Sequence, residues 1–131
     1  MSNIHKIHGI LNIFAISLFT FGVIIAFIRE LIGEKWFIIH ITSQLCATLI
    51  LTISVILVIY TSTNKNKPDP KTKIGRHKIL GKILLSLIYF QILFAFIGKR
   101  LLDRNIWVIL HTIIASIILI LGWLQIYLII K

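Results

Sequence analysis

Four long apolar blocks occupy most of the 131-residue chain, at residues 7–28, 36–60, 79–97 and 106–130. A bilayer core of about 30 Å is crossed by about 20 apolar residues of helix, so each block is long enough to span it. Isolated strands are excluded because lipid offers no partner to their backbone N–H and C=O groups. Only 14% of the residues are charged, too few for the surface of a soluble domain of this size. The sequence therefore predicts an all-α, multi-pass integral membrane protein.

The connections between the blocks decide how the helices run. They are short except for residues 61–78, which hold both prolines and many of the lysines. Short connections make consecutive helices antiparallel. We expect one domain, residues 1–131, folded as a four-transmembrane-helix antiparallel bundle. The expected helices cover about 7–28, 36–60, 77–98 and 106–130.

The formal net charge of +10 would suggest nucleic acid as the partner of a soluble protein. Here the charges flank membrane spans and no soluble module is present to hold a duplex, so lipid is the expected partner and nucleic acid is excluded. The single cysteine, Cys46, lies inside the second block and cannot form an intrachain disulfide. We interpret it as a small buried apolar residue.

Lysine and arginine are unevenly distributed over the two faces that four spans create. Both termini and the 61–78 loop share one face, which carries nine of these residues against five on the other. The nine are Lys6, Lys65, Lys67, Lys71, Lys73, Arg76, Lys78, Lys82 and Lys131, and the five are Arg29, Lys35, Lys99, Arg100 and Arg104. The positive-inside rule places the termini in the cytoplasm.

Four of the five histidines stand at the start of the expected helices, one to each: His8, His40, His77 and His111. An ionisable side chain at membrane depth is costly and marks a functional site by default. A single histidine near the interface could simply bond to a neighbour. Four at matching positions favour a shared function.

Antiparallel helices sort these histidines into two layers. His8 and His77 begin helices on the face of the termini, whereas His40 and His111 begin helices on the opposite face. Two histidines that face each other across a helical bundle are the axial ligands of a haem iron. The sequence therefore predicts that the bundle encloses two haems, stacked across the membrane.

The spacing supports a weakly duplicated helical hairpin. His8 and His40 are 32 residues apart, and His77 and His111 are 34 apart. Trp36 and Trp107 each precede a histidine by four residues. They are placed for the aromatic belt at the membrane interface, or to cover the haem of that layer.

Residues on the same helical face as each histidine are small or polar. Fourteen residues turn a helix by about 1400°, close to four full turns, and advance it by about 21 Å, which is the depth of the other layer. The residues at this spacing are Gly22, Ser54, Gln91 and Gln125. Nearer the histidines, Asn12, Gln44 and Gly81 each follow one by four residues, and Ser116 follows His111 by five. Such residues suit the neighbourhood of a haem and its ligands, although small and polar residues also mark ordinary contacts between membrane helices.

Several stretches together resemble the four-helix core of the eukaryotic-type cytochrome b561 family, in the form fused to DOMON domains. They are HGILNIFAISLFTFGVIIAFIRE, WFIIHITSQL, GRHKILGKILLSLIYFQILFAFIG and NIWVILHTIIASIILILGWLQIYL. The shared features are the HG pair of the first helix, H-x-x-x-Q of the second, H-x-x-x-G with a later Gln in the third, and W-x-x-x-H of the fourth. The resemblance covers nearly the whole chain.

This resemblance implies two haem b groups per chain, with axial ligand pairs His8/His77 and His40/His111. It also implies a transmembrane oxidoreductase, with ascorbate as typical donor and monodehydroascorbate or a ferric chelate as acceptor. Family members are often homodimers, so a second copy is an expected partner. The chain departs from the family in holding four helices where six are usual, and no DOMON domain. The family topology also places the start of the first helix outside the cytosol, opposite to the lysine count, so the orientation stays open.

Basic residues near each layer are candidates for binding anions. In the family the cytosolic donor site lies near the histidine of the second helix, which here suggests Arg29, Lys35 and Arg100. On the other face Lys71, Lys73, Arg76, Lys78 and Lys82 could bind an anionic acceptor or the haem propionates. Each of them could equally be an interface anchor whose charged end reaches the headgroups.

Two other functions fit part of the pattern. A quinol-linked di-haem cytochrome b also uses paired histidines in a four-helix bundle, and differs in its electron donor. A cofactor-free structural or pore-forming protein fits the basic loops but gives no reason for four histidines at paired depths. A metal transporter is disfavoured because Glu30, Glu34, Asp69 and Asp103 all lie in loops or at span ends.

Overall fold

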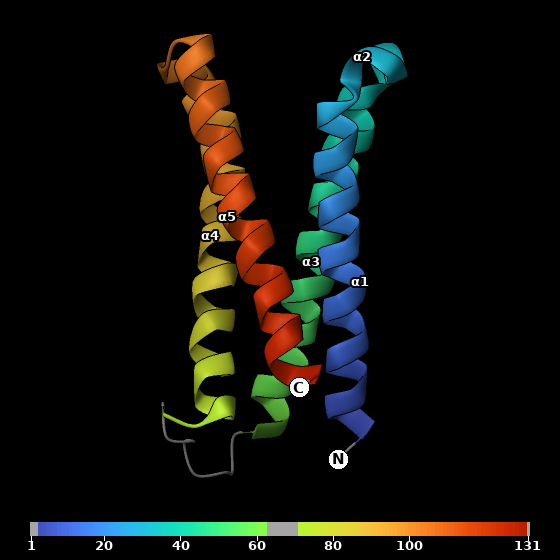
Figure 1. The fold of residues 1–131 in the computed structure, drawn as a ribbon, viewed down its shortest axis with the longest axis vertical. Coiled ribbons are helices and arrows are strands. Elements are labelled where there is room, and N and C mark those ends of the chain that lie inside the picture. The colour runs from blue at the N-terminus through green and yellow to red at the C-terminus, as the bar shows by residue number, and fades with distance from the viewer. Residues whose placement is uncertain (1–2, 63–70, 131) are drawn as a thin grey trace. The chain divides into compact units, whose positions relative to one another are not determined.

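The computed structural model describes residues 3–62 and 71–130 of the chain. Its regular structure within these residues is helical, in the order α1 (Asn3–Phe27), α2 (Arg29–Ile32), the 3-10 helix η1 (Gly33–Lys35), α3 (Trp36–Ser62), α4 (Lys73–Leu101) and α5 (Arg104–Ile130) (Figure 1). By length and composition α1, α3, α4 and α5 can each cross a membrane. This confirms the expected helical character and fits a multi-pass membrane protein.

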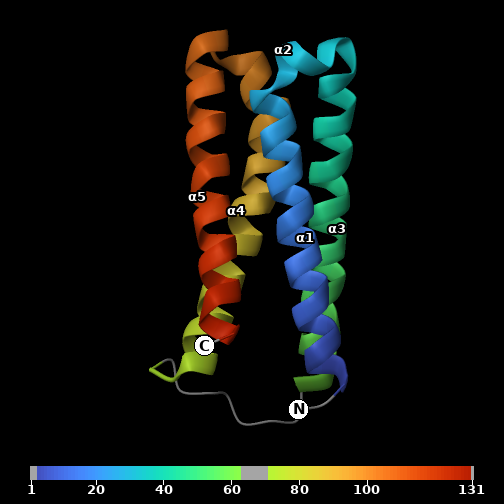
Figure 2. The same cartoon turned by 45° about the vertical axis from the view of Figure 1, so that its right-hand side comes forward.

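The chain divides into two compact units, residues 1–67 and 68–131. The first contains α1 packed against α3, and the second contains α4 packed against α5. We call them the first and the second hairpin (Figure 2). The helices extend beyond the ranges expected from hydropathy, since α1 begins at Asn3 and α4 runs from Lys73 to Leu101. Hydropathy locates the apolar part of a helix, whereas its hydrogen bonds continue into the polar residues on either side.

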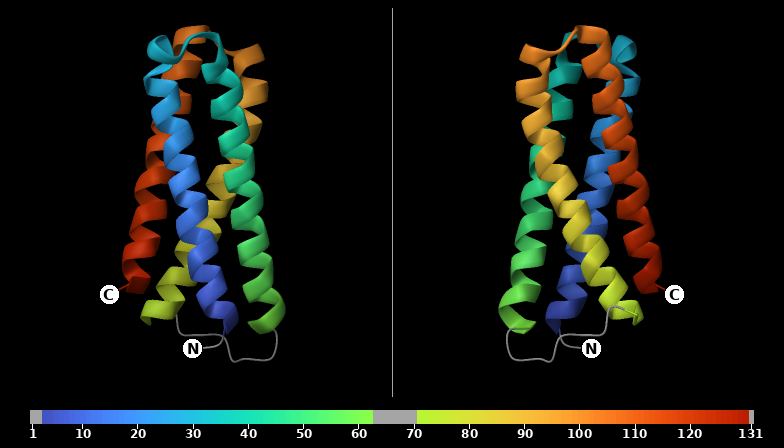
Figure 3. Two further views of the ribbon diagram at one scale, coloured as in Figure 1. Left: turned by 90° about the vertical axis from the view of Figure 1, so that its right-hand side faces the viewer. Right: turned by 90° about the vertical axis from the view of Figure 1, so that its left-hand side faces the viewer.

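The turn of the first hairpin is itself helical and consists of α2 and η1 (Figure 3). Gly33 has a φ of +73°, a backbone conformation that glycine adopts without steric cost. Its N–H donates to the carbonyl of Arg29, which ends α2. Residues expected to be a plain loop therefore form two short helical segments.

The turn of the second hairpin is tighter, because only Leu102 and Asp103 separate α4 from α5. The N–H of Leu102 donates to the carbonyl of Gly98 at 2.9 Å. Asp103 caps α5, and its Oδ1 accepts from the N–H of Asn105 at 2.9 Å. A side-chain acceptor at this position satisfies one of the N–H groups that the first helical turn leaves unpaired.

The contact between α1 and α3 contains small and polar side chains beside buried large ones such as Phe19 and Leu51. Buried residues there include Ala15 and Ala47, together with the polar Ser43, Thr48 and Ser54. Small residues let membrane helices approach closely, and buried polar groups then find partners on the neighbouring helix.

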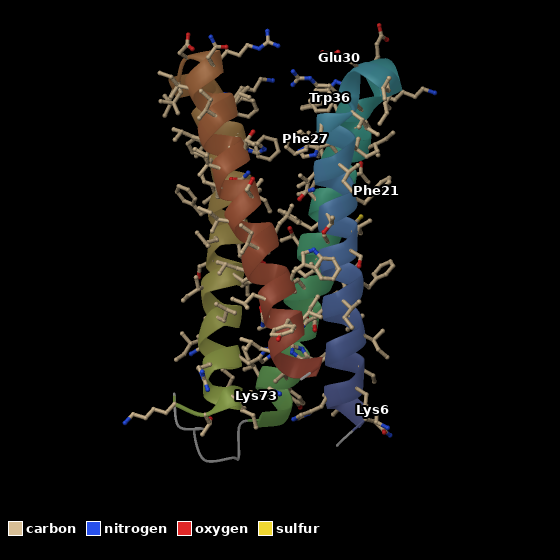
Figure 4. All side chains as sticks on the ribbon, in the orientation of Figure 1. Lys6, Phe21, Phe27, Glu30, Trp36 and Lys73 are labelled. Carbon is tan, nitrogen blue, oxygen red and sulfur yellow. The ribbon has the colours of Figure 1, made fainter. Side chains whose placement is uncertain are left out.

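Many of the large apolar side chains are exposed, as expected where lipid is the solvent. Phe21 projects from α1 away from α3 and is 47% exposed (Figure 4). Cys46 is also exposed, so its interpretation as a buried residue is wrong. It follows Leu45 on the outer side of α3, whereas Ser43 and Ala47 occupy the inner side.

We expect Asp103→Ala to destabilise the second hairpin by about 1 kcal/mol, because the start of α5 loses its cap. Unfolding by SDS in detergent micelles, followed by circular dichroism, measures the change. Asp103→Asn is the matched control, since its side-chain oxygen can still accept from Asn105. Equal loss in both variants would show that charge rather than capping is responsible.

Candidate functional site

His40 lies one turn into α3, and its ring is fixed from α1. Its Nδ1 donates to the carbonyl of Gly22 at 2.7 Å. A carbonyl can only accept, so the proton of the neutral imidazole sits on Nδ1 and the lone pair on Nε2. This is the arrangement that a histidine ligating a metal through Nε2 usually shows.

Glycine at position 22 makes this contact possible. A Cβ built there would collide with the amide of Gln44 and the hydroxyl of Ser43. The Nε2 of Gln44 donates to the carbonyl of Phe19 at 3.0 Å, and the hydroxyl of Ser43 donates to the carbonyl of His40 at 2.9 Å. Gln44 thus holds α1 against α3 rather than bonding to the His40 ring. Ser43 was not singled out from the sequence, although its place three residues after His40 is a usable signal.

At the opposite end of the first hairpin, His8 belongs to a buried polar network. Its Nδ1 lies 3.1 Å from the carbonyl and 2.8 Å from the hydroxyl of Ser54, which is fully buried. The hydroxyl of Ser54 in turn donates to Oδ1 of Asn12 at 2.8 Å. The amide of Asn12 approaches Nε2 of His8 at 3.0 Å, so Nδ1 of His8 is the protonated nitrogen here as well. Asn12 would have to release Nε2 before that atom could bind iron.

In the second hairpin, His111 lies between a tryptophan and a glutamine. The Trp107 ring stacks on the imidazole, with ring centroids 5.1 Å apart and an interplanar angle of 22°. The indole N–H of Trp107 donates to the carbonyl of Phe94 on α4 at 3.3 Å. The Nε2 of Gln91 lies 3.0 Å from Nδ1 of His111 and donates to the His111 carbonyl at 2.9 Å.

The tryptophan and histidine rings of the first hairpin are farther apart and less parallel than those of the second. Trp36 and His40 have ring centroids 6.2 Å apart and an interplanar angle of 44°. Both tryptophans therefore lie near the histidine four residues later, as side chains at this spacing do on a helix. The repeated W-x-x-x-H motif packs an indole near the ring of each histidine.

His77 is half-buried on α4, with its Nδ1 turned into the protein. Gly81, one turn later, closely approaches α5, because a Cβ there would come within 2.8 Å of Nε2 of Gln125. Gly22 and Gly81 thus both lie against a polar side chain of the neighbouring helix, although at Gly81 only the end of the flexible Gln125 side chain would have to move for a methyl group.

Each hairpin brings residues fourteen positions after a histidine to the depth of the other histidine. Gly22 lies beside His40, Ser54 beside His8 and Gln91 beside His111. Gln125 lies beside Gly81, one turn from His77. The spacing of about 21 Å along each helix therefore separates two polar layers within each hairpin.

The basic residues expected to bind anions are exposed at the hairpin ends. In the first hairpin, Arg29 and Lys35 lie in the turn. In the second, Arg100 lies at the end of α4, and four others lie at or just before its start: Lys71, Lys73, Arg76 and Lys78. Exposure at the helix ends agrees equally with anion binding and with anchoring at the headgroups.

The surroundings of His40 fit ligation of a haem through Nε2, whereas His8 would first have to lose the bond that Asn12 makes to its Nε2. His40 is in the form that binds a metal through Nε2, and Gly22 removes the Cβ that would displace its partners. Gln91 is buried and its Oε1 has no hydrogen-bond partner among the described residues, which leaves an acceptor beside His111.

Comparisons with protein-family models, curated proteins and solved structures found no match to the chain.

We expect Gly22→Ala to lower the stability of the first hairpin by about 1–3 kcal/mol, because the added methyl group displaces Gln44 and Ser43. Gly9→Ala on the same helix is the matched control, since a Cβ there meets nothing within 4 Å. Both changes add the same helix propensity, so their difference isolates the collision. SDS unfolding followed by circular dichroism measures it, and equal stabilities would contradict the close approach at Gly22.

Proposed function

We propose that the protein is a di-haem b-type cytochrome that carries electrons across a membrane. The observation that best supports this is the hydrogen bond from Nδ1 of His40 to the Gly22 carbonyl. Such a bond fixes the ring orientation and raises the basicity of the Nε2 lone pair, and metal-ligating histidines almost always make one. A histidine with a purely structural role inside a membrane needs a hydrogen-bond partner, but it does not need the proton on Nδ1 and the lone pair on Nε2.

In this proposal His40 and His111 hold one haem, and His8 and His77 hold the other. The expected alternation of four antiparallel helices supports these pairs, because it would bring each pair of histidines to the same depth. A haem held by two imidazoles would transfer single electrons rather than bind oxygen. The two layers are about 21 Å apart along each helix, so electrons would pass from one membrane face toward the other.

The surrounding residues orient the ligands and keep water out. The Gly22 carbonyl, the Ser54 hydroxyl and the Gln91 amide each contact Nδ1 of a histidine. The indole of Trp107 covers a face of the His111 ring. Fixed partners of this kind, together with burial, are what a protein uses to set a haem reduction potential.

The likeness to the cytochrome b561 family adds a donor and an acceptor to the proposal. Ascorbate would be oxidised at one face, where Arg29, Lys35 and Arg100 supply positive charge for an anion. Monodehydroascorbate or a ferric chelate would be reduced at the other. There Lys71, Lys73, Arg76 and Lys78 supply the charge.

The absorption spectrum of the purified protein tests this function first, oxidised and then reduced with ascorbate, together with a count of haem per chain. We expect two low-spin b-type haems per chain that ascorbate reduces. Reduction by a quinol but not by ascorbate would instead indicate a quinol-linked cytochrome b. A protein that stays colourless after expression with ample haem would rule out the cytochrome.

Histidine variants then test the ligand pairs. We expect His40→Ala and His111→Ala each to remove one and the same haem, leaving about half of the absorbance. His8→Ala and His77→Ala should remove the other. His5→Ala is the control, since His5 is exposed and lies three residues before His8 on α1. Loss of both haems from every variant except His5→Ala would contradict independent sites.

A further inference from the structure

Gln91 contacts His111 at the nitrogen opposite the one that would bind iron. Its side chain is only 6% exposed. One amide nitrogen serves two acceptors, Nδ1 of His111 at 3.0 Å and the His111 carbonyl at 2.9 Å. The amide oxygen is buried and has no hydrogen-bond partner among the described residues, which is energetically unfavourable.

The direction of this bond is opposite to that at His40. An amide NH₂ can only donate, so Nδ1 of His111 accepts and the proton of the neutral ring sits on Nε2. At His40 the ring donates from Nδ1 to the Gly22 carbonyl, and Nε2 carries the lone pair. The two histidines of one proposed ligand pair therefore show opposite tautomers.

We propose that Gln91 is a positioning residue whose amide reverses when His111 ligates iron, so that Oε1 accepts from Nδ1. The inference rests on the proposed function, because binding through Nε2 requires the ring proton on Nδ1. Rotation about the last side-chain bond exchanges the amide oxygen and nitrogen at nearly the same place. Reversal gives up the bond to the His111 carbonyl and brings the otherwise unpartnered oxygen to the ring.

As a consequence, the side chain of Gln91 sets the basicity of the His111 imidazole as an iron ligand. A stronger acceptor on Nδ1 makes the imidazole more basic, which favours the ferric state and lowers the reduction potential. At His40 the acceptor is a backbone carbonyl, which substitution does not remove. Gln91 therefore controls the potential of one haem only.

The test is a redox titration of the full-length, haem-loaded protein, with low-temperature electron paramagnetic resonance of the ferric state. The variants are Gln91→Glu, a stronger acceptor, and Gln91→Leu, which accepts no bond. We expect the haem that His111→Ala removes to shift to lower potential in Gln91→Glu and to higher potential in Gln91→Leu. The other haem should keep its potential, and the resonance of only the first should change.

Ser86→Ala is the control on α4, because Ser86 is exposed and lies five residues before Gln91, on another side of the helix. It should shift neither potential. Two bound haems with unchanged potentials in both Gln91 variants would overturn the inference, as would shifts of the same sign. If Gln91→Glu does not bind haem, Gln91→Leu alone tests the inference. A higher reduction potential of the haem that His111→Ala removes supports it, and an unchanged potential overturns it. Absence of haem from the unaltered protein is a different result, which rejects the proposed function itself.

Discussion

Polar side chains within a membrane must find hydrogen-bond partners inside the protein, because hydrocarbon supplies none. This constraint organises both hairpins. His8 and His40 are each bonded to the neighbouring helix at Ser54 and Gly22, and His111 is bonded to Gln91. The hydrogen bonds that offset the cost of burying each ring also fix its orientation. Helix packing and the orientation of the imidazole rings therefore have one physical origin.

The two hairpins meet this constraint in different ways. In the first, a hydroxyl group is central, since Ser54 contacts both His8 and Asn12. The second relies on larger groups, with Gln91 and Trp107 on either side of His111. Histidines at equivalent positions of the two hairpins therefore have unequal surroundings.

Much of this arrangement could be predicted from the sequence, because it depends on periodicity. Helix length gave the spans, and the fourteen-residue spacing placed Gly22, Ser54 and Gln91 at the depth of the histidines they contact. Side-chain direction could not be predicted in this way. Gln44 is on the face of His40 and yet bonds to Phe19, because the rotamer depends on which carbonyl of the facing helix lies within reach. The ligand pairs that join the two hairpins stay predictions.

The local character of the contacts has a consequence for biogenesis. Each hairpin joins helices that are adjacent in sequence, and the second needs a turn of only Leu102 and Asp103. Contacts between neighbouring segments form early, since little chain entropy is lost in closing a short loop. A pair of helices that satisfies its own polar groups can leave the translocation channel together and enter lipid as one unit. In the proposed cytochrome, haem insertion would then follow the insertion of both hairpins, since each proposed ligand pair takes one histidine from each.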